Sequence, residues 1–267
     1  MRHTARVLLA AFKAHLIATF QYRVQEGMSM VGLLIESLIY LVVWTTVSEA
    51  RGGEVGGFST DEIAGYFIAW MFVRNVTTGW SPYAMEWRIR RGDFNSLLLR
   101  PIHPIFADTS EMLASKAVAM ITVVPAMIAL ALVFKPRFEL VPWSLLALIP
   151  ALVLAFVLRY VLMYVLALTA FWTTRLGGLF ELWYGVEFFF SGRVAPLTVL
   201  PEWAQQVANL LPFKWMFYFP LELLLGRSQP DEMLFGFAMQ VLWLTVMVLL
   251  MRFVWQRAAR RYAAVGG

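Results

Sequence analysis

Several long runs of apolar residues constrain what this chain can fold into more than any other feature of its sequence. About 20 consecutive apolar residues form a helix long enough to cross the roughly 30 Å apolar core of a bilayer. Only 15% of the residues are charged and 60% are apolar, whereas a soluble domain carries about a quarter charged residues. The sequence therefore predicts an all-α, polytopic membrane protein with six transmembrane helices. They are expected near residues 28–47, 63–79, 112–134, 143–172, 177 to the break at SGRVAP (191–196), and 233–254.

The remaining segments complete a single transmembrane domain over residues 1–267. Residues 1–25 mix basic and apolar residues and predict a cytoplasmic amphipathic helix on the membrane surface. Residues 195–228 are apolar but interrupted by prolines, which predicts a re-entrant or interfacial pair of short helices on the outer side. Such irregular backbone is tolerated where it is buried or lines a cavity, so this hairpin forms either a functional vestibule or a plain interfacial cap. Spans one to four occupy 28–172, spans five and six occupy 177–254, and 255–267 form a basic cytoplasmic tail.

The distribution of basic residues predicts which side of the membrane each loop faces. With six crossings, both termini and the second and fourth loops share one side, which carries thirteen Lys and Arg residues against six on the other side. Basic residues concentrate in cytoplasmic loops, so both termini are predicted to be cytoplasmic. The thirteen are Arg2, Arg6, Lys13, Arg23, Arg88, Arg90, Arg91, Arg100, Arg175, Arg252, Arg257, Arg260 and Arg261. The six are Arg51, Lys135, Arg137, Arg193, Lys214 and Arg227.

Several kinds of site are missing from the sequence. Without cysteine the chain has no disulfide, no catalytic thiolate and no Cys-based metal site. It contains no G-x-x-x-x-G-K-[ST] phosphate loop and no H-E-x-x-H zinc motif. The net charge of +5 fits the bias of cytoplasmic loops and does not indicate nucleic-acid binding. We therefore expect no catalytic residue, no metal, no cofactor and no enzyme activity in this chain itself.

Charged residues inside the predicted spans are candidates for a functional site, because a charge at membrane depth is costly and faces protein or a watery cavity. Two interpretations stay open. The glutamates and arginines either pair and fix the packing of the helices, or line a translocation route. The candidates are Glu36, Arg74, Asn75, Arg159 and Glu187, with Lys116 as a further charge inside a predicted span.

A run of phenylalanines at the mouth of the re-entrant region is the candidate for an outer gate. Phe188, Phe189 and Phe190 lie in VEFFFSG, directly before the break in the fifth predicted span. Packing against lipid explains these rings equally well. The prolines that interrupt the following segment belong to the same candidate gate, namely Pro196, Pro201 and Pro212.

The predicted cytoplasmic stretch MEWRIRRGDFNSLLLRPIHP, residues 85–104, is basic at one end and leucine-rich at the other. Gly92 suits the residue after a short helix, Asp93 suits the cap of a second one, and Pro101 ends it. The element either lies in the lipid interface or docks into a cytosolic partner and passes movement to the adjoining spans. The residues assigned to it are Arg88, Arg90, Arg91, Gly92, Asp93, Phe94, Leu97, Leu98, Arg100 and Pro101.

Two motifs carry a resemblance to a known family. RIRRGDFNSLLLRPIHP resembles the cytoplasmic loop of integral-membrane permeases of the type-2 ATP-binding-cassette (ABC) exporter family, where a basic stretch, a Gly, an apolar cluster and Arg-Pro follow the second span. SGRVAPLTVLPEWAQQVANLLPF is similar to that family's segment after the fifth span. The resemblance extends over essentially the whole chain.

The resemblance implies the membrane-spanning subunit of an ATP-driven exporter in a bacterial-type cell (inner) membrane. The partners it implies are a second permease, identical or distinct, and a separate cytosolic ATPase that binds ATP and Mg. Residues 86–101 would be the coupling helix, with arginines at the membrane and leucines inserted into the ATPase. An ion-coupled secondary carrier and a non-transporting membrane scaffold remain alternatives. The substrate stays open, since a drug-like molecule, a lipid or a lipid-linked glycan would each suit an apolar route.

Overall fold

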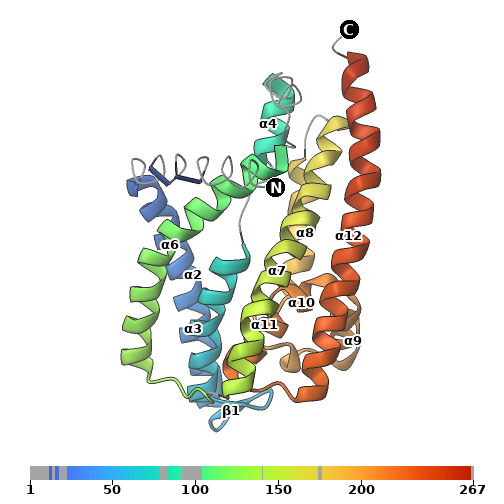
Figure 1. The fold of residues 1–267 in the computed structure, drawn as a ribbon. Helices are drawn as coiled ribbons and strands as arrows, with labels where there is room; N and C mark the ends of the chain where they lie inside the picture. The colour runs from blue at the N-terminus through green and yellow to red at the C-terminus, as the bar shows by residue number, and fades with distance from the viewer. Residues whose placement is uncertain are drawn as a thin grey trace.

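The structure, a computed structural model, describes residues 12–13, 16–17, 23–78, 83–91, 104–139, 141–173 and 176–265. Long helices run along one axis of the molecule, and shorter elements connect them, some of which pack among the long helices (Figure 1). The long helices are α2 (Arg23–Ala50), α3 (Thr60–Thr77), α6 (Pro104–Phe134), α7 (Pro142–Leu168), α8 (Gly177–Phe190) and α12 (Pro230–Val265). The short elements are β1 (Glu54–Val55), β2 (Phe58–Ser59), α4 (Tyr83–Arg91), η1 (Thr169–Phe171), η2 (Leu197–Val199), α9 (Glu202–Leu210), α10 (Pro212–Met216) and α11 (Tyr218–Leu225).

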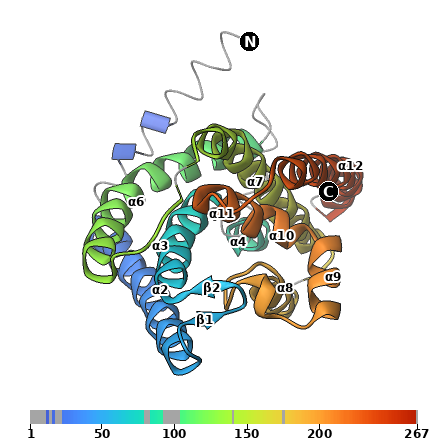
Figure 2. The ribbon, with the colours of Figure 1, turned by 90° about the horizontal axis from the view of Figure 1, so that it is seen from below.

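Helix α3 lies at the centre of the bundle, with α2, α6, α7 and α11 around it (Figure 2). Its side chains are apolar on nearly every face, which is typical of a helix enclosed by other helices. Tyr66 and Trp70 are among the largest fully buried side chains of the described residues. Because lipid is as apolar as these side chains, close packing and polar contacts between helices hold such a bundle together.

Buried polar side chains tie the outer helices to this centre. The amide nitrogen of Gln240 in α12 donates to the backbone carbonyls of Ala151 at 3.1 Å and Trp215 at 2.9 Å. The hydroxyl of Ser144 in α7 donates to the carbonyl of Leu223 at 2.6 Å. These side-chain donors thus find backbone acceptors inside the protein, as buried polar groups must at membrane depth.

The loops sort into two sets at opposite ends of the molecule (Figure 1). The β1–β2 hairpin, residues 135–139 and the connection from α11 to α12 lie at one end, which we call the hairpin end. Helix α4, the start of α8 and the C-terminal part of α12 lie at the other, which we call the α4 end. The basic-residue count separates the loops into the same two sets, and the assignment of the α4 end to the cytoplasm stays a prediction.

Three of the described helical segments are long and apolar enough to cross a membrane, namely Asp108–Phe134, Pro142–Phe171 and Pro230–Ala258. The multi-pass α-helical class therefore agrees with the sequence analysis, whereas the count of six crossings stays a prediction. The expected N-terminal helix over 1–25 lies outside the described residues, apart from helical pieces at 12–13 and 16–17 and the start of α2 at Arg23.

The helix bounds differ most from the predicted segments at two places. α6 begins at Pro104 and not near 112, because its first turns include Asp108, which is buried against protein and breaks the hydropathy pattern. The predicted tail over 255–267 continues α12 as far as Val265. α8 begins at Gly177 and ends directly before Ser191, as the sequence predicts, but its 14 residues make only about 21 Å of helix, which is less than a full crossing.

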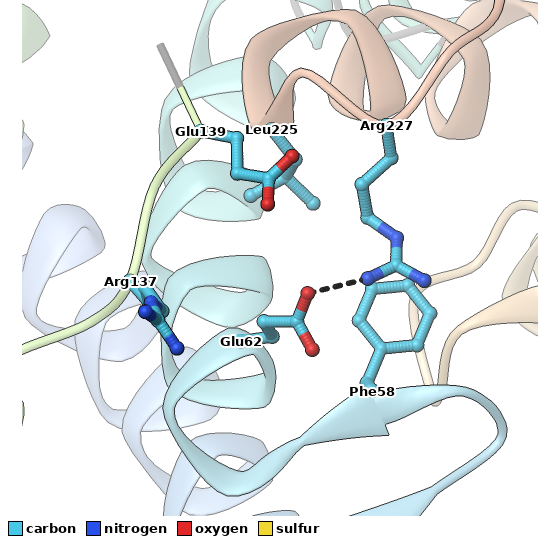
Figure 3. Close-up of a pocket in the computed structure, with 6 residues that line it drawn as sticks. All are labelled: Phe58, Glu62, Arg137, Glu139, Leu225 and Arg227. Carbon is cyan, nitrogen blue, oxygen red and sulfur yellow. Dashed lines mark hydrogen bonds and ion pairs between the residues drawn. The ribbon is translucent and has the colours of Figure 1, made fainter.

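An ion pair closes the hairpin end (Figure 3). Gly56 and Gly57 take positive φ angles of 61° and 80°, which suits the tight turn between β1 and β2. Arg227 reaches back over this turn, donating to Glu62 at 2.6 Å and to the carbonyl of Gly57 at 2.8 Å, with its guanidinium 3.9 Å from the centre of the Phe58 ring. These contacts hold the hairpin to the segment that leads into α12.

Stability at acid pH is expected to depend on this ion pair. Glu62 lies one residue before the predicted second span. Its partial burial would by itself raise its pKa, but the hydrogen bonds with Ser59 and the Arg227 guanidinium outweigh burial and hold the pKa below its usual range. A carboxyl with a lowered folded-state pKa stabilises the fold above its unfolded pKa of about 4.3, and that stabilisation is lost as pH falls through the folded pKa.

We therefore expect Arg227→Gln to lower the stability at pH 7 by about 1 kcal/mol or less, since the pair is partly exposed. The fall in the thermal unfolding midpoint from pH 6 to pH 3 should be smaller in Arg227→Gln than in the wild-type protein. Thermal unfolding in detergent across that range measures both effects. Identical pH profiles for the two proteins would contradict the assignment.

Candidate functional site

Charged side chains from three segments meet halfway along the bundle. Glu36 of α2 and Arg74 of α3 each lie fourteen residues from the hairpin end of their helix, which is about 21 Å. Arg74 donates to one carboxylate oxygen of Glu36 at 2.6 Å, and Nε of Arg193 donates to the other at 2.8 Å. A single carboxylate therefore serves two guanidinium groups.

A second ion pair joins α7 to α8 beside the first. Nη2 of Arg159 lies 3.1 Å from a carboxylate oxygen of Glu187, and the two side chains are only 6% and 4% exposed. Nε1 of Trp183 donates to the other oxygen of Glu187 at 3.2 Å, and Phe217 stacks under the Arg159 guanidinium at 4.5 Å. The pairs Arg74–Glu36 and Arg159–Glu187 both join a glutamate to an arginine from the set of intramembrane charges that the sequence analysis singled out.

A cavity of about 240 Å³ lies between these two ion pairs. Its walls come from α3, α7, α8 and the segment after α8. It combines three guanidinium groups with aromatic and hydroxyl side chains. The lining residues are Trp70, Arg74, Thr78, Arg159, Tyr184, Glu187, Ser191, Arg193 and Phe217.

Hydrogen-bond donors and positive charge predominate around this cavity. Nε1 of Trp70 and the hydroxyl of Thr78 are buried, and neither has a hydrogen-bond partner among the described residues. Lys116 of α6 adds a further cation, donating to the carbonyl of Asn75 at 2.5 Å and to that of Thr78. These carbonyls belong to the C-terminal end of α3, where the helix dipole favours a cation. Asn75 therefore contributes its backbone to the surroundings of the cavity.

The end of α8 explains how Arg193 reaches Glu36. The helix stops at Phe190, and the hydroxyl of Tyr66 in α3 donates to the carbonyl of Gly192 at 2.5 Å. This contact holds the chain after α8 toward the inside of the bundle, where Ser191 and Arg193 line the cavity. Irregular backbone at membrane depth is tolerated in such a position, because it does not face lipid. The sequence analysis counted Arg193 among the outer basic residues, and the structure corrects this placement. The signal available in the sequence was the break in apolar continuity at SGRVAP.

The predicted gate residues occupy different surroundings. Phe188 packs near Tyr40 and lies 5.3 Å under the Arg193 guanidinium, whereas Phe189 is 58% exposed. Phe190 packs against the buried core. The three prolines each stand at the start of a short helix and do not line the cavity, with Pro196 before η2, Pro201 before α9 and Pro212 as the first residue of α10.

Helix α4 is anchored inside the chain at the opposite end. Arg88 pairs with the buried carboxylate of Asp108 in α6, and Glu86 accepts a hydrogen bond at 3.2 Å from the backbone N–H of Leu176, which precedes α8. Met85 is fully buried in a cluster with Tyr164 of α7. The sequence assigned Arg88 to the coupling element with its guanidinium at the membrane surface. The structure turns this side chain inward, because the buried Asp108 requires a counter-charge.

The rest of the predicted coupling element lies outside the described residues. This holds for Gly92, Asp93, Phe94, Leu97, Leu98, Arg100 and Pro101. Helix α4 itself ends at Arg91, whose guanidinium lies 3.4 Å from the ring centre of Trp87. Trp87 is 55% exposed, so α4 presents an aromatic and cationic surface beside its buried one. The backbone of Arg90 belongs to the same helix.

The comparison with protein families decides which class of membrane protein carries this site. A family model described as ABC-2 family transporter protein matches residues 33–266. The chain belongs to the ABC-2 transporter family. A search of the curated proteins returns no match. The family confirms the resemblance found in the two sequence motifs and makes the chain a multi-pass permease subunit of an ABC transporter.

Membership in the ABC-2 family also indicates what kind of complex the cavity and helix α4 belong to. ABC-2 membrane proteins are transport subunits, usually without an ATP-binding site of their own, and their transporters in general include an ABC ATPase. The charged cavity therefore lies in the membrane part of a transporter. Helix α4 lies at one end of the helices that surround this cavity.

Proposed function

We propose that this ABC-2 permease is the membrane-spanning subunit of an ATP-driven exporter and that residues 86–101 couple it to a separate cytosolic ATPase. It forms the translocation route with a second permease, identical or distinct. The α4 end and both termini face the cytoplasm of a cell with a bacterial-type inner membrane. ATP and Mg are bound by the partner ATPase, and the charged cavity belongs to the route.

The ion pair between Arg88 and Asp108 carries this proposal. Asp108 is 1% exposed and lies in the first turns of α6. Separating Arg88 from this buried carboxylate would cost several kcal/mol, roughly 3–5 for a buried pair, so a displacement of α4 also moves α6. Glu86 links α4 to the start of α8 in the same way, and the rings of Tyr83 and Phe180 lie 5.2 Å apart. A push on α4 therefore reaches α6 through Asp108, and it reaches α8, whose far part lines the cavity, through Glu86.

Two variants separate docking of the ATPase from transmission of its movement. Leu97→Asp with Leu98→Asp should abolish co-purification of the ATPase encoded beside this chain, while the permease still purifies as a folded protein. Asp108→Asn should retain the ATPase but weaken the coupling by about tenfold, within the usual 1–3 kcal/mol of coupling energies. Glu111→Gln is the matched control. Glu111 also pairs with Arg88, but its carboxylate is exposed and lies 3.8 Å from the guanidinium, so this contact is weak.

Transmission is measured at the hairpin end without knowledge of the substrate. The chain has no cysteine, so spin labels on cysteines placed at the exposed Glu54 and Gln206 report one distance across that end. ATP with vanadate should change this distance in the wild-type complex and in Glu111→Gln, and much less in Asp108→Asn. An equal change in Asp108→Asn, or retention of the ATPase by the double leucine variant, would reject coupling through this element.

A further inference from the structure

We infer that the cavity between α3, α7 and α8 binds the anionic headgroup, a phosphate or a carboxylate, of an amphiphilic substrate. The inference rests on the proposed transport function and specifies the substrate class for the same cavity. It depends on three observations: the balance of charge around the cavity, the unpaired donors in its wall and its size.

The charges around the cavity do not cancel. Arg74, Arg159 and Arg193 line it, and the two carboxylates that pair with them are Glu36 and Glu187. One positive charge of these five groups is therefore left over. Pairing for structural reasons would need one carboxylate for each guanidinium, because an uncompensated charge at this depth is costly. A bound anion supplies the missing negative charge.

Two residues of the cavity wall each carry a buried donor that has no partner among the described residues. Trp70 is 1% exposed, and its Nε1 can only donate, yet none of the described residues accepts from it. The hydroxyl of Thr78 is likewise buried without a partner among the described residues. Each guanidinium carries five N–H donors, more than its carboxylate partner occupies. A group with several acceptor oxygens satisfies these donors, which a neutral apolar molecule cannot do.

The size of the cavity restricts the rest of the ligand. Its volume of about 240 Å³ corresponds to about eight water molecules. Sites for complete drug-sized ligands start at about 300 Å³. The cavity therefore holds a headgroup, and the apolar part of the substrate lies outside it.

The test measures binding of radiolabelled dihexanoyl phosphatidic acid to the purified permease in a zwitterionic detergent. Saturable binding of one molecule per chain is expected, with no competition from dihexanoyl phosphatidylcholine, whose headgroup has no net charge. Competition by inorganic phosphate separates the two sources of the anion. Equal competition shows that the phosphate alone is recognised, and weak competition shows that the chain of the amphiphile contributes; both results support an anion site.

Variants at the cavity have opposite expected effects. Trp70→Phe keeps an aromatic ring and removes one donor to a charged group, so the affinity should fall about tenfold. Glu36→Gln removes a negative charge and should raise the affinity, whereas Arg193→Gln should lower it. Arg227→Gln, which removes a guanidinium at the hairpin end, is the matched control and should leave the affinity unchanged.

Equal binding of the zwitterionic lipid, or an affinity that neither Trp70→Phe nor Glu36→Gln alters, would overturn the inference. This result is distinct from failure of the transport proposal, because the binding assay needs no ATPase. An ATP-driven distance change at the hairpin end without anion binding would reject only the headgroup site. Anion binding without that distance change would leave the site and reject the ATP-driven coupling.

Discussion

Arg159→Met is expected to destabilise the permease by about 3–5 kcal/mol, the cost of removing one partner of a buried ion pair. The substitution leaves a buried Glu187 carboxylate, 4% exposed in the wild-type protein, with Trp183 as its one remaining hydrogen-bond donor among the described residues. For a chain of this size such a loss corresponds to a fall of about 10 °C in the thermal unfolding midpoint. Size-exclusion chromatography in detergent and thermal unfolding measure the effect.

The double variant Arg159→Met with Glu187→Met separates the charge from the packing. Replacing both members of a buried pair with apolar side chains is often nearly neutral. We expect the double variant to recover most of the lost stability, while Arg252→Met, at an exposed position of α12, changes little. A double variant as unstable as the single one would mean that shape, and not uncompensated charge, dominates at this site.

Gly226→Ala is expected to disrupt the hairpin end, with a loss of about 3 kcal/mol or more. Gly226 ends α11 with φ 72° and ψ 15°, a left-handed conformation that costs other residues about 1–2 kcal/mol. A Cβ atom at this position would also lie 2.0 Å from the carbonyl oxygen of Glu139, which belongs to backbone and cannot rotate away. The substitution should therefore separate the α11–α12 connection from residues 135–139.

Gly185→Ala in α8 is the matched control. A Cβ atom at Gly185 meets nothing within 4 Å, and alanine has the higher helix propensity, so the unfolding midpoint should stay the same or rise. Thermal unfolding in detergent compares both variants with the wild type. Equal midpoints for the two variants would show that residues 135–139 move aside at little cost.

The class of the protein and the positions of most helices were predictable from the sequence. Apolar runs mark helices in contact with lipid or with apolar neighbours, and this signal depends only on consecutive residues. The first turns of α6 show its limit. Asp108 makes that stretch appear polar, yet the carboxylate is buried against Arg88, which comes from another part of the chain.

The candidate site was predictable in part. The cost of charge at membrane depth selected Glu36, Arg74, Arg159 and Glu187 from the sequence, and the structure brings all four together. It did not select Trp70, because one more tryptophan in an apolar helix carries no signal until its Nε1 is seen buried without an acceptor.

The sequence by itself determined that the chain is a multi-pass helical membrane protein with a basic loop, charges in its spans and the motifs of ABC-2 permeases. Each of these features can be read from residues that are neighbours along the chain. The tertiary structure alone decided which charges meet. Arg193 and Glu36 stand 157 positions apart, and they pair because α8 ends at Phe190 and Tyr66 turns the chain inward. The excess of cations over carboxylates around one cavity depends on this turn, because hydropathy and spacing along the chain do not encode distances across a bundle.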